Sequence, residues 1–279
     1  MVINNISKSM SFGILQGRLS HSSAGRFQFS PLDWKLEFQR AAELGFSTIE
    51  WLFDWPDWKE NPILSAQSEK EIFGVVESSG IPINSICADY FMKYRLAGPE
   101  GYESALMAAQ LVQVVAKFTI QKVLLIPFLE QNAYPTEGER AEVIANLTPV
   151  LKQAERFGVR IGLETEMSVA ELVPFLDRVK SHSIGVYYDI GNCTSYGFDC
   201  PSDLRILGKR VFGVHVKDRK VGSPQSLVLG NGDAHLFGCL NTLKDVGFEG
   251  TPIMQAWRGE NYLYDAKSQL EFLQSRGVL

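Results

Sequence analysis

Short apolar runs alternate with longer amphipathic segments along the whole chain. The apolar runs are nearly continuous rather than alternating with polar residues, which is the pattern of parallel strands covered on both faces. They predict strands at residues 11–16, 47–52, 83–88, 122–127, 159–164, 184–189, 211–217 and 251–256. No linker rich in Pro, Gly or Ser divides these runs, so residues 1–279 are predicted to form a single domain.

Segments with helical periodicity lie between the strands, at residues 31–45, 69–80, 101–118, 136–158, 170–181 and 232–247. Many of them end in a glycine, which readily adopts the left-handed conformation that follows a helix. Eight strands, each followed by a helix or helical turn, fit the length of a (β/α)8 barrel within 279 residues. A doubly wound open sheet is the alternative, but no G-x-G-x-x-G follows the first strand. The predicted fold is therefore α/β, a single (β/α)8 TIM barrel.

Four polar side chains stand at or near the ends of four successive predicted strands: Glu164, Asp189, His215 and Gln255. Because the site of a TIM barrel lies at the carboxyl ends of its strands, these side chains should converge. Two carboxylates, an imidazole and an amide oxygen suit a divalent metal ion such as Mn²⁺, Co²⁺, Zn²⁺ or Mg²⁺. The spacing therefore predicts a metal site. The alternative is that each is a lone polar residue satisfied by a neighbour.

Several motifs resemble those of a known family. They are "GLETE" (162–166), "YYDIGNCTSYGFD" (187–199), "GVHVKDRK" (213–220) followed by a G-x-G-D turn, and "IMQAW" (253–257). They resemble the xylose-isomerase-like barrel superfamily of sugar isomerases and epimerases, and within it most of all the hexulose-6-phosphate (L-xylulose-5-phosphate) 3-epimerase family. The resemblance covers nearly the whole chain and is sharp from about residue 159 onward. It implies a metal-dependent sugar or sugar-phosphate isomerase or epimerase, with Glu164, Asp189 and His215 as metal ligands.

The chain departs from this family at Gln255, where the resemblance places a fourth metal ligand that is a glutamate in the family. There, two metal-bound glutamates are the acid and base groups that act on a proton next to a carbonyl, through an enediolate. Glu164 can fill one of these catalytic roles, but a neutral amide at Gln255 cannot take up a proton.

Three functions remain open. In the first, Glu164 alone shuttles a proton between adjacent carbons, which gives an aldose–ketose isomerase. In the second, Glu166, Glu50 or Asp89 replaces the missing base, and the protein is still an epimerase. In the third, the protein is a non-catalytic or divergent barrel that binds metal and sugar without turning the sugar over.

Five residues are candidate substrate contacts: Glu166, Asn192, Lys217, Arg258 and Arg95. Asn192 matches the resembling family, and Lys217 lies on the same strand face as His215. Arg258 and Arg95 could bind a phosphate, because a guanidinium fork matches phosphate oxygens. The alternatives are a salt-bridged loop for Lys217 and ordinary surface positions for the arginines. The turn at 230–233 could bind an anion through its amides, although its aspartate is expected to cap the next helix.

Composition argues against nucleic acids and membranes as partners and leaves a small molecule. A formal net charge of −5 and a pI near 5.5 argue against binding to a nucleic-acid backbone. Only 4 histidines are present, too few for the three-metal cluster of apurinic-site endonucleases that share this barrel.

No apolar stretch long enough for a membrane span or a signal peptide is found, which predicts a cytoplasmic protein. The 4 cysteines are expected to be reduced packing residues. Barrels of the resembling family often pair, so a homodimer is expected.

Overall fold

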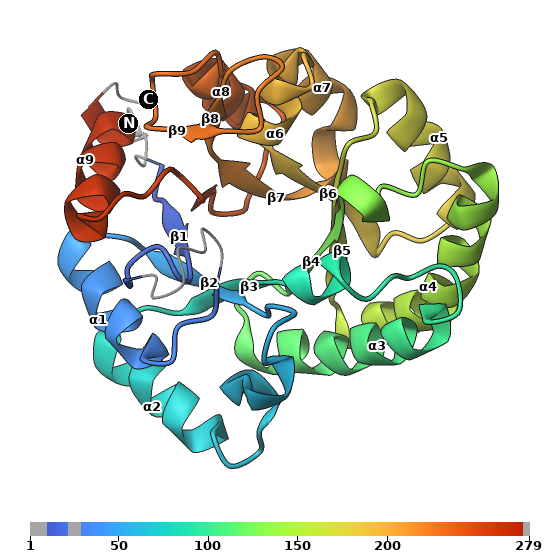
Figure 1. The fold of residues 1–279 in the computed structure, drawn as a ribbon, viewed down its shortest axis with the longest axis horizontal. Helices are drawn as coiled ribbons and strands as arrows, with labels where there is room; N and C mark the ends of the chain where they lie inside the picture. The colour runs from blue at the N-terminus through green and yellow to red at the C-terminus, as the bar shows by residue number, and fades with distance from the viewer. Residues whose placement is uncertain (1–9, 22–28, 276–279) are drawn as a thin grey trace, which may run out of the picture.

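The computed structural model describes residues 10–21 and 29–275. Parallel strands close into a barrel in the order β1-β10-β7-β6-β5-β4-β3-β2, with helices around the outside (Figure 1). The strands are β1 (Gly13–Leu15), β2 (Thr48–Leu52), β3 (Ile83–Cys87), β4 (Val123–Phe128), β5 (Arg160–Thr165), β6 (Ile184–Asp189), β7 (Val211–Val216) and β10 (Ile253–Met254). The predicted (β/α)8 barrel is confirmed. Each predicted strand segment overlaps one of these strands, and β4 and β5 each end one residue beyond the predicted bound, at Phe128 and Thr165. That residues 1–279 form one domain stays a prediction.

Amphipathic helices cover the outer face of the barrel (Figure 1). They are α1 (Trp34–Leu44), α2 (Glu69–Ser79), α3 (Gly101–Phe118), α4 (Glu137–Phe157), α5 (Val169–Val179), α7 (Cys200–Leu207), α8 (Leu236–Asp245) and α9 (Tyr262–Ser275). A short helix, α6 (Ile190–Ser195), follows β6 directly. In α3 the buried side chains include Ala108, Leu111, Val112 and Val115, at the spacing that places one helix face against the strands. None of the described helices is long and apolar enough to cross a bilayer.

The aromatic ring of Tyr187 is fully buried in a cluster of apolar side chains inside the barrel. Gly162 and Gly213 on the neighbouring strands leave room for this ring. A Cβ at Gly213 would overlap the ring, and a Cβ at Gly162 would lie 3.1 Å from the Tyr187 Cβ. The glycines in "RIGLE" and "VFGVHV" therefore let a tyrosine cross the barrel, where its hydroxyl donates a hydrogen bond to Glu50 at 2.6 Å.

The loop after β7 carries a two-stranded antiparallel sheet of β8 (Asp218–Arg219) and β9 (Ser226–Leu227). The buried Asp218 carboxylate accepts hydrogen bonds from the backbone amides of Gly230, Gly232 and Ala234, at 2.8, 2.9 and 3.1 Å. The amides predicted to take an anion therefore bind a carboxylate of the same chain.

The prediction that Asp233 caps the following helix is wrong. Helix α8 begins at Leu236, and His235 is its N-terminal flanking residue. The Asp233 carboxylate instead accepts a hydrogen bond from the Val221 amide at 3.0 Å. The four cysteines are free and buried, which confirms the expectation of reduced packing residues.

Candidate metal centre

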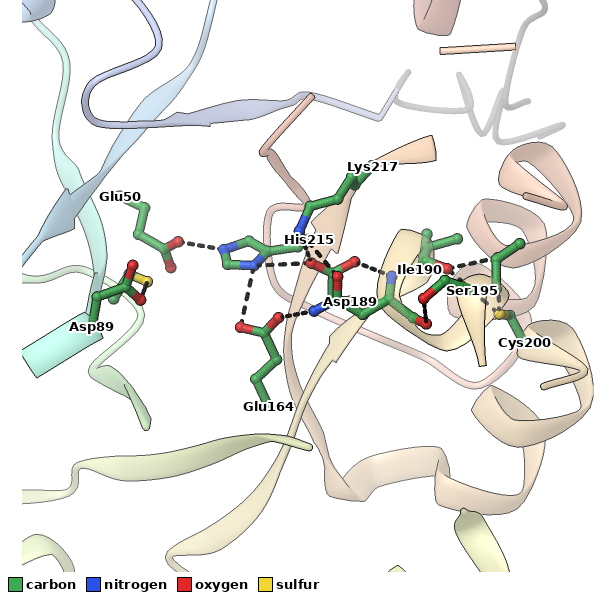
Figure 2. Close-up of polar contacts among 12 residues, drawn as sticks. Glu50, Asp89, Glu164, Asp189, Ile190, Ser195, Cys200, His215 and Lys217 are labelled. Atoms are coloured by element: carbon green, nitrogen blue, oxygen red, sulfur yellow. Dashed lines mark hydrogen bonds and ion pairs between the residues drawn. The ribbon is translucent and has the colours of Figure 1, made fainter. Parts of the chain in front are cut away.

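Three side chains from successive strands point toward one another at the carboxyl end of the barrel (Figure 2). Nδ1 of His215 lies 3.8 Å from Oε2 of Glu164 and 3.8 Å from Oδ2 of Asp189. One ligand atom from each of the three residues lies within 4.8 Å of the others, and all three residues are buried. The structure therefore brings together three of the four residues that the strand ends indicated.

Strand register explains this convergence. Glu164 is the penultimate residue of β5, Asp189 is the last residue of β6, and His215 lies in β7 directly opposite Asp189. Asp189 also begins helix α6, where its Oδ1 accepts a hydrogen bond from the Asn192 amide at 2.8 Å. This cap holds one carboxylate oxygen, so the other is directed toward His215.

Gln255 comes from the strand beside β7. Ile253 of β10 pairs with His215 and belongs to the interior cluster, so two residues later the Gln255 side chain lies on the same interior face, nearer the mouth. Its backbone amide donates to the carbonyl of Val216 at 3.1 Å, which continues the pairing beyond the strand. Its position is thus compatible with the predicted fourth ligand.

Three buried polar atoms of this group have no hydrogen-bond partner: Nδ1 of His215, Oε1 of Gln255 and Oδ2 of Asp189, the last of which forms an ion pair with Lys217. Such atoms are costly to bury unless something binds them. An imidazole nitrogen, an amide oxygen and two carboxylates are the donor types that borderline divalent cations accept. The residues present therefore fit a divalent metal ion, and the unpartnered atoms are those that would bind it.

Asn192 and Lys217 connect the two carboxylates of the group. Asn192 Nδ2 donates a hydrogen bond to Glu164 Oε1 at 2.6 Å, and Lys217 Nζ donates to Asn192 Oδ1 at 3.2 Å. The same ammonium lies 2.7 Å from Asp189 Oδ2. Both predicted substrate-contact residues therefore lie in the candidate site, where they orient the acids.

The pKa values of the two acids are shifted in opposite directions. Burial, together with the charge of Asp189, raises the pKa of Glu164. Burial alone would also raise the pKa of Asp189, but the charges of Lys217 and His215 outweigh it and lower that pKa. Glu164 is thus the group that binds a proton more readily, and Asp189 is the one that stays charged.

His215 is held from behind by Glu50, which lies on the side of the ring away from the two acids (Figure 2). Glu50 Oε2 lies 2.6 Å from His215 Nε2, and the Glu50 side chain is fully buried. Burial lowers the pKa of His215, but the negative charge of Glu50 and its hydrogen bond raise it overall. Sequence considerations named Glu50 as a replacement base, whereas this enclosed position gives it another role.

The other three predicted substrate contacts, Glu166, Arg95 and Arg258, bind residues outside the candidate site. Glu166 accepts a hydrogen bond from the backbone amide of Glu130. Arg95 forms an ion pair with Glu139 at 2.6 Å. Arg258 donates to the backbone carbonyls of Gly17 and Ser20. Both arginine forks thus have partners within the chain, and their predicted contact with a phosphate stays a prediction.

Sequence reasoning missed Arg18, which is nearly buried in the loop after β1. Burial, and after it the charge of Arg258, lowers its pKa to about 9, while the charge of Asp89 acts in the opposite direction. A cation is rarely buried without a functional or structural reason. The only signal in the sequence was its position, three residues after an apolar strand.

Comparisons with known proteins agree with this architecture. A family model described as xylose isomerase-like TIM barrel matches residues 38–276. The L-ribulose-5-phosphate 3-epimerase UlaE of Salmonella heidelberg (strain SL476) is 23% identical over 236 residues, which are 80% of this chain and 82% of that protein.

Solved structures are similar in fold at lower sequence identity. The structure of D-psicose 3-epimerase with D-tagatose from Clostridium cellulolyticum H10 has a TM-score of 0.72 and is 18% identical in sequence. The superposed region is 95% of this chain and 99% of the epimerase chain. The crystal structure of the IolI protein with a zinc atom has a TM-score of 0.72 and is 16% identical in sequence. The superposed region is 96% of this chain and 99% of the IolI chain. As its motifs predicted, the chain belongs to the xylose isomerase-like TIM barrel family.

Proposed function

We propose that this protein is a metal-dependent isomerase or epimerase of a sugar or sugar phosphate. The observation that carries the proposal is the convergence of Glu164, Asp189 and the unpartnered Nδ1 of His215 at the barrel mouth. Its similarity to UlaE supports the substrate class, because that relative is named as a sugar-phosphate epimerase.

Glu164, Asp189, His215 and Gln255 would hold the metal ion, through two carboxylates, Nδ1 and an amide oxygen. A bound divalent cation would polarise a sugar carbonyl and stabilise the negative charge that develops beside it. Similarity to the IolI structure that contains zinc supports a cation in this barrel type. The donor set suits Mn²⁺, Co²⁺, Zn²⁺ or Mg²⁺.

Glu164 is the proposed proton acceptor. Burial and the charge of Asp189 raise its pKa in the metal-free site, and a bound cation would favour its charged form, which is the form that accepts a proton. Asn192 donates a hydrogen bond to one of its oxygens and leaves the other directed into the site. Glu164 can therefore take a proton from the carbon next to a carbonyl and return it.

The second proton-transfer group cannot be Gln255, because an amide has no useful basicity. Glu50 does not suit the role either, since it is fully buried and bonded to other side chains behind His215. Asp89 remains a candidate, because burial raises its pKa and it is only partly enclosed. With Asp89 the enzyme is an epimerase, and with Glu164 alone it is a one-base isomerase.

Solvent-proton exchange tests the proposal most simply. The protein is incubated in deuterated water with Mn²⁺ and a panel of ketoses and ketose 5- or 6-phosphates, and deuterium beside the carbonyl is measured by NMR. We expect incorporation with at least one sugar, and loss of it on addition of a chelator. A changed sugar identifies isomerisation or epimerisation, whereas exchange with unchanged sugar means that one base works alone.

Variants sharpen this experiment. Glu164→Gln at saturating Mn²⁺ should lower exchange by about 10²- to 10⁴-fold, the usual contribution of a general base. Glu171→Gln is the matched control, because this carboxylate caps the start of α5 and pairs with Arg140, and it makes no described contact with the candidate site. If wild type binds metal and sugar but no sugar exchanges, the protein is the non-catalytic binder, and the proposed activity is wrong.

The apurinic-site endonuclease is not supported. Among the described residues, His215 is the one histidine in the groups that could hold a metal. His182 lies in the connection that leads into β6, at the other end of the barrel, and His235 flanks the start of α8. Incubation with an abasic-site DNA duplex and Mn²⁺ should leave the strand uncut.

A further inference from the structure

We propose that Glu50 is a positioning residue for the metal site: it fixes the His215 ring so that Nδ1 faces the cation. The inference rests on the proposed function, because it assumes that His215 is a metal ligand. It assigns a role to a residue of β2 that lies on the other side of the imidazole from the two acids (Figure 2).

Glu50 is held in one orientation by three hydrogen bonds. Its Oε1 accepts from the Ser85 hydroxyl and from the Tyr187 hydroxyl, each at 2.6 Å. Its Oε2 lies 2.6 Å from His215 Nε2. The partners come from β3, β6 and β7, so this carboxylate joins four strands of the barrel at one point.

The chemistry of these contacts sets the tautomer of His215. An ionised carboxylate can only accept hydrogen bonds, so Nε2 must carry the proton and donate it to Glu50. In the neutral ring the lone pair then belongs to Nδ1, the unpartnered atom that faces Glu164 and Asp189. A carboxylate behind a ligand histidine also makes the imidazole a stronger electron donor.

Packing restricts the ring further. The rings of Tyr187 and His215 lie 4.6 Å apart between centroids, at an interplanar angle of 54°. Tyr187 therefore packs against the imidazole ring and also donates a hydrogen bond to the carboxylate that binds Nε2 of that ring. The room that Gly213 leaves for this ring is part of the same arrangement.

The negative charge of Glu50 is especially useful in this chain because Gln255 is neutral. Gln255 supplies no negative charge, so the cation would be left with only two anionic ligands. The charge of Glu50 acts on the cation through the imidazole and offsets part of that loss. A carboxylate at the centre of a barrel is otherwise costly to bury, and an apolar side chain would fill the same space at lower cost.

Metal affinity measured by calorimetry with MnCl₂ tests the inference in the full-length protein. Glu50→Gln should weaken Mn²⁺ binding by about 10- to 100-fold, the usual effect of losing such a partner. Tyr187→Phe keeps the carboxylate and loses one of its donors, so we expect a smaller loss. Glu37→Gln is the matched control: it removes another buried carboxylate, one that accepts from the Gly17 and Leu19 amides, and should leave the Mn²⁺ affinity unchanged.

A second measurement separates positioning from loss of fold. In protein labelled with ¹⁵N-histidine and loaded with Zn²⁺, the His215 spectrum should show a protonated Nε2 and a metal-bound Nδ1. In Glu50→Gln this signal should weaken or shift toward mixed tautomers while circular dichroism and the melting curve still report a folded barrel.

The possible outcomes distinguish this inference from the proposed function. Mn²⁺ affinity in Glu50→Gln within about twofold of wild type overturns the inference alone, and so does a His215 ring bound to Zn²⁺ through Nε2. If wild type binds Mn²⁺ and depends on Glu50 but exchanges no sugar proton, the inference stands and the proposed function is wrong. If wild type binds no divalent metal, both are wrong.

Discussion

Replacing Gln255 with glutamate adds a negative charge to a pocket that already contains two carboxylates. The candidate ligand atoms of Glu164, Asp189 and His215 lie within 4.8 Å of one another. Burial and the charge of Asp189 raise the pKa of Glu164, so its charged form is already disfavoured in the metal-free pocket. A third carboxylate would face a similar cost, so the metal-free variant should be less stable than wild type or carry an extra proton.

A bound cation would instead make the third carboxylate favourable. A divalent cation and a carboxylate 4 Å apart attract by about 8 kcal/mol at an effective dielectric constant of 20, and loss of the extra proton offsets part of that gain. We expect Gln255→Glu to bind Mn²⁺ about 10- to 100-fold more tightly, or ~1.4 to ~3 kcal/mol. A second base would also be restored, so epimerisation should rise.

Calorimetry and melting curves with and without Mn²⁺ measure these effects. The melting temperature of metal-free Gln255→Glu should be lower than that of wild type, and its rise on adding Mn²⁺ should be larger. Gln255→Leu is the control, because it removes the amide oxygen without adding charge and should weaken binding. An Mn²⁺ affinity of Gln255→Glu equal to or below that of wild type would refute the placement of Gln255 beside the cation.

Three further predictions concern the scaffold. Gly213→Ala should lower the free energy of unfolding in urea by about 1–3 kcal/mol, because the new Cβ overlaps the Tyr187 ring; unchanged stability would contradict that packing. Asp218→Ala removes the acceptor of three loop amides and should cost about 2 kcal/mol and speed protease cleavage within residues 220–234. Burial raises the pKa of Glu37 to about 7, so its contribution to stability is present at acidic pH and is lost as pH rises through 7. Relative to Glu37→Gln, wild type should therefore lose stability as pH rises from 4.5 to about 7, by up to ~1.4 kcal/mol per pH unit, and level off above that; an unchanged stability difference between the two proteins across this range would count against it.

The fold and the convergent site were predictable because both follow from local patterns. Continuous apolar runs identify strands covered on both faces, and Glu164, Asp189 and His215 stand out because a polar residue at the end of such a run has few structural reasons to be there. Barrel geometry then brings the ends of successive strands together. No long-range information was needed for this step.

The roles of the supporting residues depend on partners distant in sequence. Glu50 meets Tyr187 137 residues away and His215 165 residues away, which no local pattern reveals. A charged residue inside the apolar strand "TIEWL" was a signal that Glu50 has a function, but not which one.

The prediction at Asp233 was wrong because the helix was expected to start at residue 232, whereas α8 begins at Leu236. Asp218 and Asp233 are both aspartates near a glycine-rich turn, and either could accept bonds from its amides. The structure places the buried Asp218 there and leaves Asp233 bonded to Val221. The partners of Arg95 and Arg258 could not be predicted from the sequence either, since a guanidinium group binds phosphate, carboxylate and backbone carbonyl alike.

A crystal grown or soaked with MnCl₂, with anomalous data recorded at the manganese edge, tests the central claim most directly. The account predicts one strong peak at the carboxyl end of the barrel, bonded to Glu164, Asp189, Nδ1 of His215 and the amide oxygen of Gln255. An empty barrel mouth at saturating Mn²⁺, or a peak elsewhere with these four side chains turned apart, would contradict it.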